Sequence, residues 1–227
     1  MDKINYSLGQ KVFHRIREDI LAGKYKSGEE LKEKSIGDEI GVSRTPVREA
    51  LRQLELEGLI HIIPNQGAYV VGISSQDMQD IYEMRSVLEG LCARRAASRI
   101  TSLQIEIMEE VLYLAEFHME RGHMGQLVDL DSKFHEILYE AGGSRILGHA
   151  LKDYHHYLER ARRISLLDPK RAPESHKEHQ AILLALKRQE GQKAEEAAAI
   201  HVNNTIQNIA SYGWDKIETG GHGNGKN

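Results

Sequence analysis

The chain has 227 residues, of which 40% are hydrophobic and 28% charged, with one cysteine and a formal net charge of -4. That length fits one small and one medium domain with a sizeable core. A single cysteine excludes an intrachain disulfide framework. The net negative charge argues against bulk electrostatic binding to nucleic acid, so any affinity for DNA must come from a local basic patch.

We expect a cytoplasmic protein with no membrane contact. No apolar run in the sequence approaches membrane-spanning length, and the first ten residues, MDKINYSLGQ, do not have the pattern of a signal peptide. The single cysteine, Cys92, fits a reducing compartment, and its apolar neighbours predict a small buried hydrophobe.

The N-terminal region, residues 1–72, predicts a winged helix-turn-helix of three helices and a β-hairpin. Apolar residues four apart predict a helix over 8–22, and a short helix follows over 33–40. Gly41 then allows a tight corner, Ser43 can cap the next helix, and Pro46 lies in its first turn. After Gly58, β-branched runs at 59–63 and 68–71 flank a Pro-Asn-Gln-Gly turn and predict the wing.

The helix that follows Gly41 has two different faces. Its apolar residues share one side by the 3.6-residue period, whereas arginines repeat every four residues on a neighbouring side, as Arg44, Arg48 and Arg52. This pattern predicts a DNA-reading helix with one buried and one basic face. An ordinary amphipathic helix with surface arginines would show the same periodicity.

From residue 73 onward the sequence predicts only helices. Thr101 and Gln104 form a capping box for one of them, and glycine or proline interrupts the others. The expected segments are 76–99, 103–121, 125–141, 145–166, 174–189 and 192–212. We therefore predict an all-α bundle of about six helices over 73–215, followed by a glycine-rich, disordered tail over 216–227.

Four residues of this predicted bundle have the chemistry of metal ligands. Asp131 and His135 are four residues apart and project from one helix face, and His179 and His201 lie on two later helices. Three imidazoles and one carboxylate suit Zn, Ni, Fe or Mn and leave coordination positions open. However, the chain holds 12 histidines, and separate histidines on helices are usually surface or core groups. Spacing alone leaves both interpretations open.

The stretch from Gly28 to Val71 resembles the N-terminal domain of GntR-family transcriptional regulators, through SRTPVREAL, the EGL after it and the GAYV after the wing tip. The resemblance implies that the recognition helix enters the major groove of DNA. It implies six DNA-contacting residues, with arginines reading base edges or phosphates, hydroxyls binding phosphate and a glycine near the minor groove: Lys34, Ser43, Arg44, Thr45, Arg48 and Gly67. Arg52 would be a solvated or phosphate-near charge.

The C-terminal part resembles the FCD-type domain of the FadR branch of that family. The similarity lies in Asp-x-x-x-Phe-His, then Glu-His-x-x-Ile, then a histidine about twenty residues later. It implies a divalent metal, zinc first and nickel, iron or manganese as alternatives, beneath an effector pocket. The implied ligands are Asp131, His135, His179 and His201, with His176 as a competitor.

Arg85 matches the Arg-x-x-Leu-Glu opening of that domain and has two interpretations. It either forms an exposed ion pair with Glu89, four residues on, or it is a cavity arginine that orients an effector carboxylate. Four further residues could line a pocket or simply pack: Tyr113, Phe117, His155 and His156.

The sequence as a whole predicts a ligand-responsive transcriptional regulator. We expect a homodimer that binds a near-palindromic double-stranded operator, represses a catabolic or transport operon, and senses a small carboxylic acid at the metal. A metal-dependent hydrolase is disfavoured because Tyr139 stands where a His-Glu-x-x-His motif starting at His135 needs its second histidine. A purely architectural DNA-binding protein would not need the helical domain.

Overall fold

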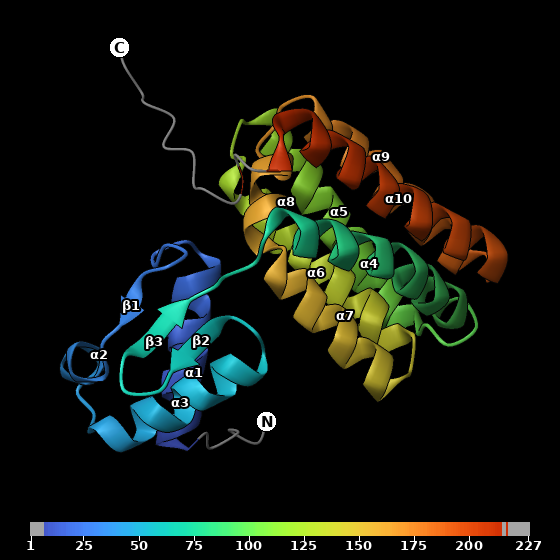
Figure 1. Ribbon diagram of the computed structural model, residues 1–227. Coiled ribbons are helices and arrows are strands. Elements are labelled where there is room, and N and C mark those ends of the chain that lie inside the picture. Colours follow the sequence, from blue (N-terminus) through green and yellow to red (C-terminus); the bar gives the residue numbers. More distant parts are fainter. Residues whose placement is uncertain (1–6, 215–216, 218–227) are drawn as a thin grey trace, which may run out of the picture. The chain divides into compact units, whose positions relative to one another are not determined.

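The computed structural model describes residues 7–214 and 217, and the chain divides into two compact units between Ser74 and Ser75 (Figure 1). The first unit contains three helices and three short strands among its described residues. They are α1 (Leu8–Leu21), β1 (Glu30–Leu31), α2 (Glu33–Ile40), α3 (Arg44–Leu56), β2 (Ile60–Ile63) and β3 (Gly67–Val70).

The core of the first unit lies where α1 packs on α3. Val12 and Ile16 of α1, and Val47 and Leu54 of α3, are at most 1% exposed, and burial of such side chains is the main stabilising contribution of a small domain. The antiparallel sheet has the order β1-β3-β2. The hairpin was predicted, but β1 was not, because a two-residue strand has no alternation to detect.

The corner between α2 and α3 has the predicted helix-turn-helix geometry. Gly41 ends α2 in the left-handed region, at φ 76° and ψ 34°, a conformation that costs glycine little. The Val42 N–H donates back to the Gly37 carbonyl at 2.8 Å. Ser43 is the N-cap residue of α3, as predicted, but its side chain makes no capping hydrogen bond.

The second unit is all helical and contains seven helices among its described residues (Figure 1). They are α4 (Ser75–Ala96), α5 (Ser102–Glu120), α6 (Gly125–Ala141), α7 (Arg145–Tyr157), α8 (Glu159–Leu166), α9 (Arg171–Lys187) and α10 (Gly191–Tyr212). The capping box at the start of α5 is present as predicted, because Thr101 and Gln104 cap each other's backbone N–H groups.

The seventh helix arises because the predicted helix over 145–166 is broken. Leu158 ends α7 at φ -96° and ψ 6°, outside the helical range, and α8 starts at Glu159. Leu158 is 0% exposed. Neither glycine nor proline marks this position, so no local signal predicts the break, and it falls at a residue that is packed into the interior.

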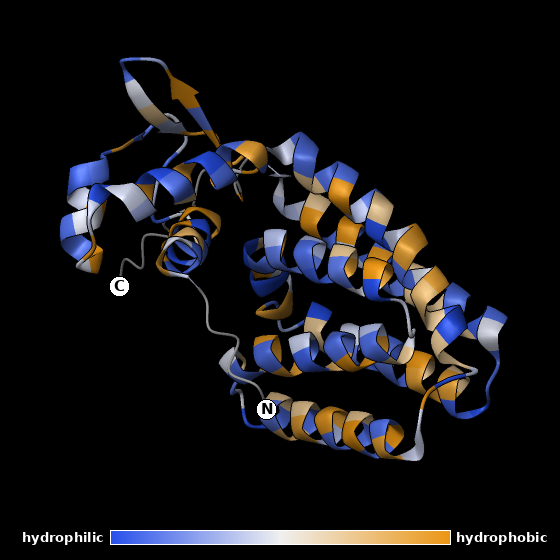
Figure 2. Ribbon diagram, turned by 90° about the horizontal axis from the view of Figure 1, so that it is seen from below, coloured by the Kyte–Doolittle hydropathy of each residue, from blue (hydrophilic) through white to orange (hydrophobic). Residues whose placement is uncertain are grey.

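The helices of the second unit surround one apolar core. α4 and α10 pack along each other, and α5 packs on α6 and α9 (Figure 1). In Figure 2 these helices alternate between hydrophobic and hydrophilic residues along their length, as helices with one buried face do. Cys92 is 1% exposed within this core, as its apolar neighbours predicted.

The predictions about membrane contact and about the C-terminal tail can be compared with the structure. None of the described helices is both long enough and apolar enough to cross a lipid bilayer. Of the tail expected over 216–227, residue 217 is described and is buried, whereas 216 and 218–227 lie outside the described residues.

Candidate functional site

The exposed basic face of the first unit lies on α2 and α3. The apolar side of α3 is buried, with Val47 and Ala50 both 0% exposed, so the opposite side faces solvent. Five of the six predicted DNA-contacting residues are exposed and the sixth is half-buried: Lys34, Ser43, Arg44, Thr45 and Arg48, then Gly67. Their exposure leaves them available to DNA, and their individual contacts stay predictions.

Arg48 already has a partner within the first unit. Its Nε donates to Glu33 Oε1 at 2.8 Å and to Glu33 Oε2 at 2.9 Å, across from α2. Both side chains are solvent-accessible, at 60% and 31%, and an exposed pair of this kind contributes about 0–1 kcal/mol. Arg48 can therefore leave Glu33 and bind a DNA phosphate or a guanine edge with little loss of free energy.

Gly67 lies at the start of β3, paired with Ile63 on β2. Its φ of +137° favours glycine, and a Cβ there would lie 3.2 Å from Glu30 Oε1. The local backbone therefore explains the glycine without DNA, and its approach to the minor groove stays a prediction.

The second unit brings the four predicted metal ligands together in its interior. Asp131 and His135 lie on α6, His179 on α9 and His201 on α10, and each is at most 8% exposed. One ligand atom from each residue lies within 4.8 Å of the others. Asp131 Oδ1 is 3.8 Å from His135 Nε2 and 3.6 Å from His179 Nε2. The cluster could therefore hold a single metal ion.

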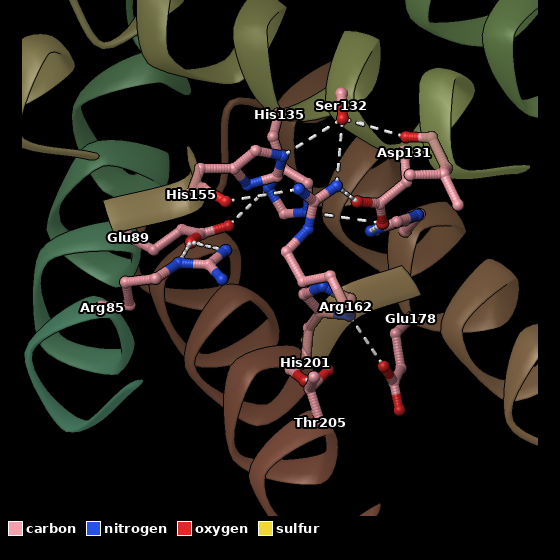
Figure 3. Close-up of polar contacts among 12 residues, drawn as sticks. Arg85, Glu89, Asp131, Ser132, His135, His155, Arg162, Glu178, His201 and Thr205 are labelled. Carbon is pink, nitrogen blue, oxygen red and sulfur yellow. Dashed lines mark hydrogen bonds and ion pairs between the residues drawn. The ribbon is translucent and has the colours of Figure 1, made fainter. Parts of the chain in front are cut away.

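His135 is oriented by a carboxylate from α4. Its Nδ1 lies 2.5 Å from Glu89 Oε1, which leaves Nε2 directed to the cluster. Glu89 also accepts from Arg85 Nη2 at 2.8 Å (Figure 3). It accepts from the Tyr139 hydroxyl as well, at 3.2 Å. A carboxylate behind a histidine fixes its tautomer and raises its basicity as a metal ligand.

His201 has the same arrangement with a carboxylate from α9. Its Nδ1 lies 2.8 Å from Glu178 Oε2. Glu178 is held in turn by Arg171 Nη1 at 2.9 Å and by Asn204 Nδ2 at 2.7 Å. Two of the three cluster histidines thus have a carboxylate on the ring nitrogen that faces away from the cluster.

Asp131 is held by a guanidinium from α8. Arg162 Nη2 donates to Asp131 Oδ2 and, at 3.0 Å, to Ser132 Oγ (Figure 3). Asp131 Oδ1 is left to face His135 and His179. Each carboxylate that contacts the cluster therefore has its own arginine: Asp131 with Arg162, Glu89 with Arg85, and Glu178 with Arg171.

The pKa shifts of His179 and Asp131 favour the protonation states of metal ligands. Burial, followed by the charge of His201, holds the pKa of His179 well below 6.5. Burial alone would raise the pKa of Asp131, but Arg162 and the histidines outweigh it and hold that pKa far below its ordinary value. Neutral imidazoles and an ionised carboxylate are the forms that bind a divalent cation.

Two ring nitrogens of the cluster, His135 Nδ1 and His179 Nε2, make no hydrogen bond, and of these only His135 Nδ1 has the Glu89 carboxylate beside it. His179 Nε2 is buried and has no hydrogen-bond partner, and an unpaired buried polar atom costs about 1–3 kcal/mol. A metal ion would satisfy it. Beside the cluster lies a small cavity of about 20 Å³, lined among others by Tyr82, Arg85, Arg162 and His201, which is room for about one water. The donor set and this vacant bonding position fit a metal.

Arg85 is 2% exposed and lines this cavity. The predicted ion pair with Glu89 is present, but it is buried rather than exposed, with side chains 3% and 0% exposed. The competing ligand His176 is buried on α9 but is not among the four clustered residues. Of the four candidate pocket residues, Tyr113 and Phe117 are exposed on α5.

Sequence reasoning missed three residues around the cluster. Glu89 was assigned only to Arg85, and its position beside His135 had no sequence signal. Glu178 directly precedes His179 in the sequence, and nothing in that position indicates that it contacts His201 on another helix. Arg162 lies between Arg160, which is half-buried, and Arg163, which is exposed, and nothing in the sequence separates the three.

The fold defines the class: a winged helix-turn-helix DNA-binding protein with an all-α second domain. The comparisons then identify the family. Residues 8–70 match the model of bacterial regulatory proteins of the gntR family, and residues 80–204 match the FCD domain. The chain therefore belongs to the GntR family of transcriptional regulators, with an FCD-type C-terminal domain, and is not an enzyme.

Curated relatives agree with this assignment. The chain is 30% identical over 203 residues to the HTH-type transcriptional repressor RspR of Escherichia coli K12, with 89% of each chain covered. It is also 30% identical over 135 residues to the gluconate operon transcriptional repressor of Bacillus subtilis, covering 60% of this chain and 55% of that one.

Among solved structures, E. coli McbR/YncC is similar at a TM-score of 0.74 and 22% identity, with 91% of this chain and 99% of that one covered. A putative GntR regulator from Rhodococcus sp. RHA1 is similar at a TM-score of 0.66 and 20% identity, with 90% and 98% covered. At these identities the likeness supports the fold alone.

Proposed function

We propose that this regulator is a ligand-responsive repressor of a catabolic or transport operon, acting in the cytoplasm. It binds a near-palindromic operator as a homodimer and releases it when a small carboxylic acid binds at a metal in the helical domain. The observation that carries this proposal is the buried cluster of one aspartate and three histidines beside a cavity lined by two arginines.

Zinc is the first candidate for the metal, with nickel, iron and manganese as alternatives. Three imidazole nitrogens and one carboxylate oxygen suit these ions, and four protein ligands leave positions open on those that take six. Asp131, His135, His179 and His201 would hold the ion, which when bound supplies a positive charge that a carboxylate can coordinate. Glu89 and Glu178 orient two of the histidines.

The effector carboxylate would be oriented by Arg85 from the cavity wall. Arg85 is buried, and its guanidinium uses Nε and Nη2 on Glu89. Because a guanidinium has five N–H donors, others remain for a ligand. Its role differs from that of the metal ligands, since it would contact the effector without contacting the ion.

We propose dimerisation because the DNA-contacting surface of one subunit is small. A single short recognition helix reads few base pairs, and a two-fold protein reads two half-sites of a palindrome. The effector would act by population shift, favouring an arrangement in which the two winged domains no longer match both half-sites.

The test measures operator affinity by fluorescence anisotropy on DNA from the promoter region of the neighbouring genes. The zinc-loaded protein is titrated with and without saturating small mono-, di- and hydroxycarboxylic acids. One acid should weaken operator binding by about 5- to 150-fold, and by reciprocity operator DNA should weaken binding of that acid by the same factor.

Asp131→Ala should abolish the response and leave DNA binding intact. Glu140→Ala is the matched control, since it removes an exposed carboxylate from the same helix. If Asp131→Ala responds as the wild type does, the cluster has no part in sensing. If neither metal nor any acid of the panel changes operator affinity, the protein is not ligand-responsive in the proposed sense.

A further inference from the structure

Two histidines meet at the C-terminal end of α5, and neither is among the four residues of the buried cluster. His118 lies in the last turn of α5 and is half-buried, whereas His123 follows the helix and is exposed. Their ring centroids are 5.7 Å apart, and their Nδ1 atoms are 3.5 Å apart. The two rings therefore direct the same nitrogen toward each other.

The backbone at this helix end has the hydrogen bonds of a Schellman motif. Gly122 adopts a φ of +70°, and its N–H donates to the Met119 carbonyl at 3.0 Å. The His123 N–H donates to the His118 carbonyl at 2.9 Å. In this motif the residue after the left-handed glycine frequently contacts the residue five positions earlier through apolar side chains. Here imidazoles occupy both positions, so the local chain brings them together.

The distance between the two nitrogens matches that of two ligands on one tetrahedral ion. Zinc–imidazole bonds are about 2.0–2.1 Å long, which places two ligand nitrogens about 3.3–3.4 Å apart at a tetrahedral angle. Neighbouring ligands of a square-planar ion would be about 2.9 Å apart, because their angle is a right angle. A hydrogen bond between the rings would be long, since an N–H···O bond is most often about 2.9–3.0 Å. The observed 3.5 Å is nearest to the tetrahedral case.

The surroundings of this histidine pair admit a cation. The C-terminal end of a helix carries a partial negative charge of about half an elementary charge, which favours positive ions. Arg121, which lies between the two histidines in the sequence, has its guanidinium over the Phe117 ring at 4.5 Å from the centroid, where a cation–π interaction holds it. Because His123 is exposed, an ion and its water ligands can reach the pair without any opening of the fold.

We propose that His118 and His123 form a surface metal site, which takes one tetrahedral divalent ion, zinc first, through their Nδ1 atoms, with water in the other positions. Two protein ligands hold an ion less firmly than the three or four of catalytic and structural zinc sites, so this ion exchanges readily with solution. When bound, it ties the last turn of α5 to the segment that leads into α6. The site is separate from the buried cluster and does not depend on the proposed function.

The test measures zinc bound to the full-length protein by equilibrium dialysis and elemental analysis over a series of free zinc concentrations. The wild type should bind one weakly held zinc more than His118→Ala and His123→Ala do. Each variant should lose at least about 10-fold in affinity for that ion, because even the loss of a group that only orients a ligand costs about 10- to 100-fold. His149→Ala removes an exposed histidine of α7 and, as the matched control, should bind as the wild type does. Zinc in the buried cluster is common to all four proteins and cancels in the comparison.

A second pair of variants tests the backbone that brings the histidines together. Asparagine tolerates the left-handed region, whereas β-branched valine does not, so Gly122→Asn should keep the weakly held zinc and Gly122→Val should bind it less tightly. Equal zinc binding in the wild type, His118→Ala and His123→Ala would overturn the inference. An equal loss in His149→Ala would overturn it as well, because it would show nonspecific binding to surface imidazoles. A loss in only one variant of the pair would show that the two histidines do not share an ion.

Discussion

The two units place their charges in opposite ways. The arginines of α3 are exposed. The ion pair between Arg48 and Glu33 is open to solvent on both sides, with side chains 60% and 31% exposed. Around the cluster of the second unit the charged side chains are buried, and each carboxylate is paired with its own arginine. In the Arg85–Glu89 pair, for example, the side chains are 3% and 0% exposed. Exposed pairs contribute little and exchange easily, whereas breaking a buried pair costs about 3–5 kcal/mol. The exposed arginines of α3 can therefore bind and release DNA, whereas the buried ion pairs keep the metal-ligand cluster in a fixed geometry.

The largest expected effect concerns the buried cluster. With metal at about a thousand times its Kd, metal binding should stabilise the protein by about 4 kcal/mol. A chelator should remove that contribution from the wild type and change His179→Ala little, because the variant lacks a ligand. The measurement is urea unfolding followed by Trp214 fluorescence, which reports on the second unit, since Trp214 is the one tryptophan and lies 6.0 Å from the Tyr82 ring.

His176→Ala is the control for that experiment, because His176 is buried on the same helix but outside the cluster. It should keep the chelator effect. If the chelator destabilised His179→Ala and left His176→Ala unchanged, His176 and not His179 would be the metal ligand on α9.

The second prediction concerns pH. Burial is the main cause that lowers the pKa of His155, His179 and His201 below 6.5, so they stay neutral in the folded, metal-free protein. Below about pH 6.5 the unfolded chain binds protons that the folded protein does not, and stability falls as pH falls. Each such histidine contributes about 1.4 kcal/mol per pH unit.

Urea unfolding of chelator-treated protein between pH 7.5 and 5 checks this prediction, again with Trp214 as the probe. The free energy of unfolding should decline steadily below about pH 6.5 and be flat above it. A flat profile across the whole range would show that these histidines take up protons in the folded state and are more accessible to water than their burial indicates.

The third prediction concerns the exposed face of α3. Arg44→Ala and Arg48→Ala should each weaken specific operator binding by about 1–3 kcal/mol without changing stability. Arg52→Ala is the matched control on the same helix, with a smaller effect that does not depend on DNA sequence. Anisotropy titrations at fixed salt give the comparison. Equal losses for all three would mean that the arginines contact phosphates only.

The fourth prediction concerns Glu178, which contacts the ligand His201 and is not itself one of the four ligands. Glu178→Gln removes the charge that orients His201 but keeps the shape, and it should weaken metal affinity by about 10- to 100-fold. Glu174→Gln, exposed on the same helix, should leave it unchanged. Competition with a chromogenic chelator measures both. Unchanged affinity in Glu178→Gln would show that Asn204 and Arg171 suffice to hold the geometry.

The sequence by itself determined the winged helix-turn-helix, because each part of it has a local signal: a 3.6-residue period on α3, a glycine corner at Gly41 and a turn before β3. It also predicted Asp131, His135, His179 and His201, partly by spacing and mainly by family resemblance. Each of these predictions depends on residues close together in the sequence or on a known family pattern. The structure brings the four ligands together.

The tertiary structure alone decided which residues support that cluster. Arg162 reaches Asp131 across 31 positions because α8 packs against α6. Glu89 meets Tyr139 across 50 positions because α4 packs against α6. A periodic pattern shows which face of a helix is buried, but not which charged residue of another helix meets it, since that depends on how all the helices pack at once.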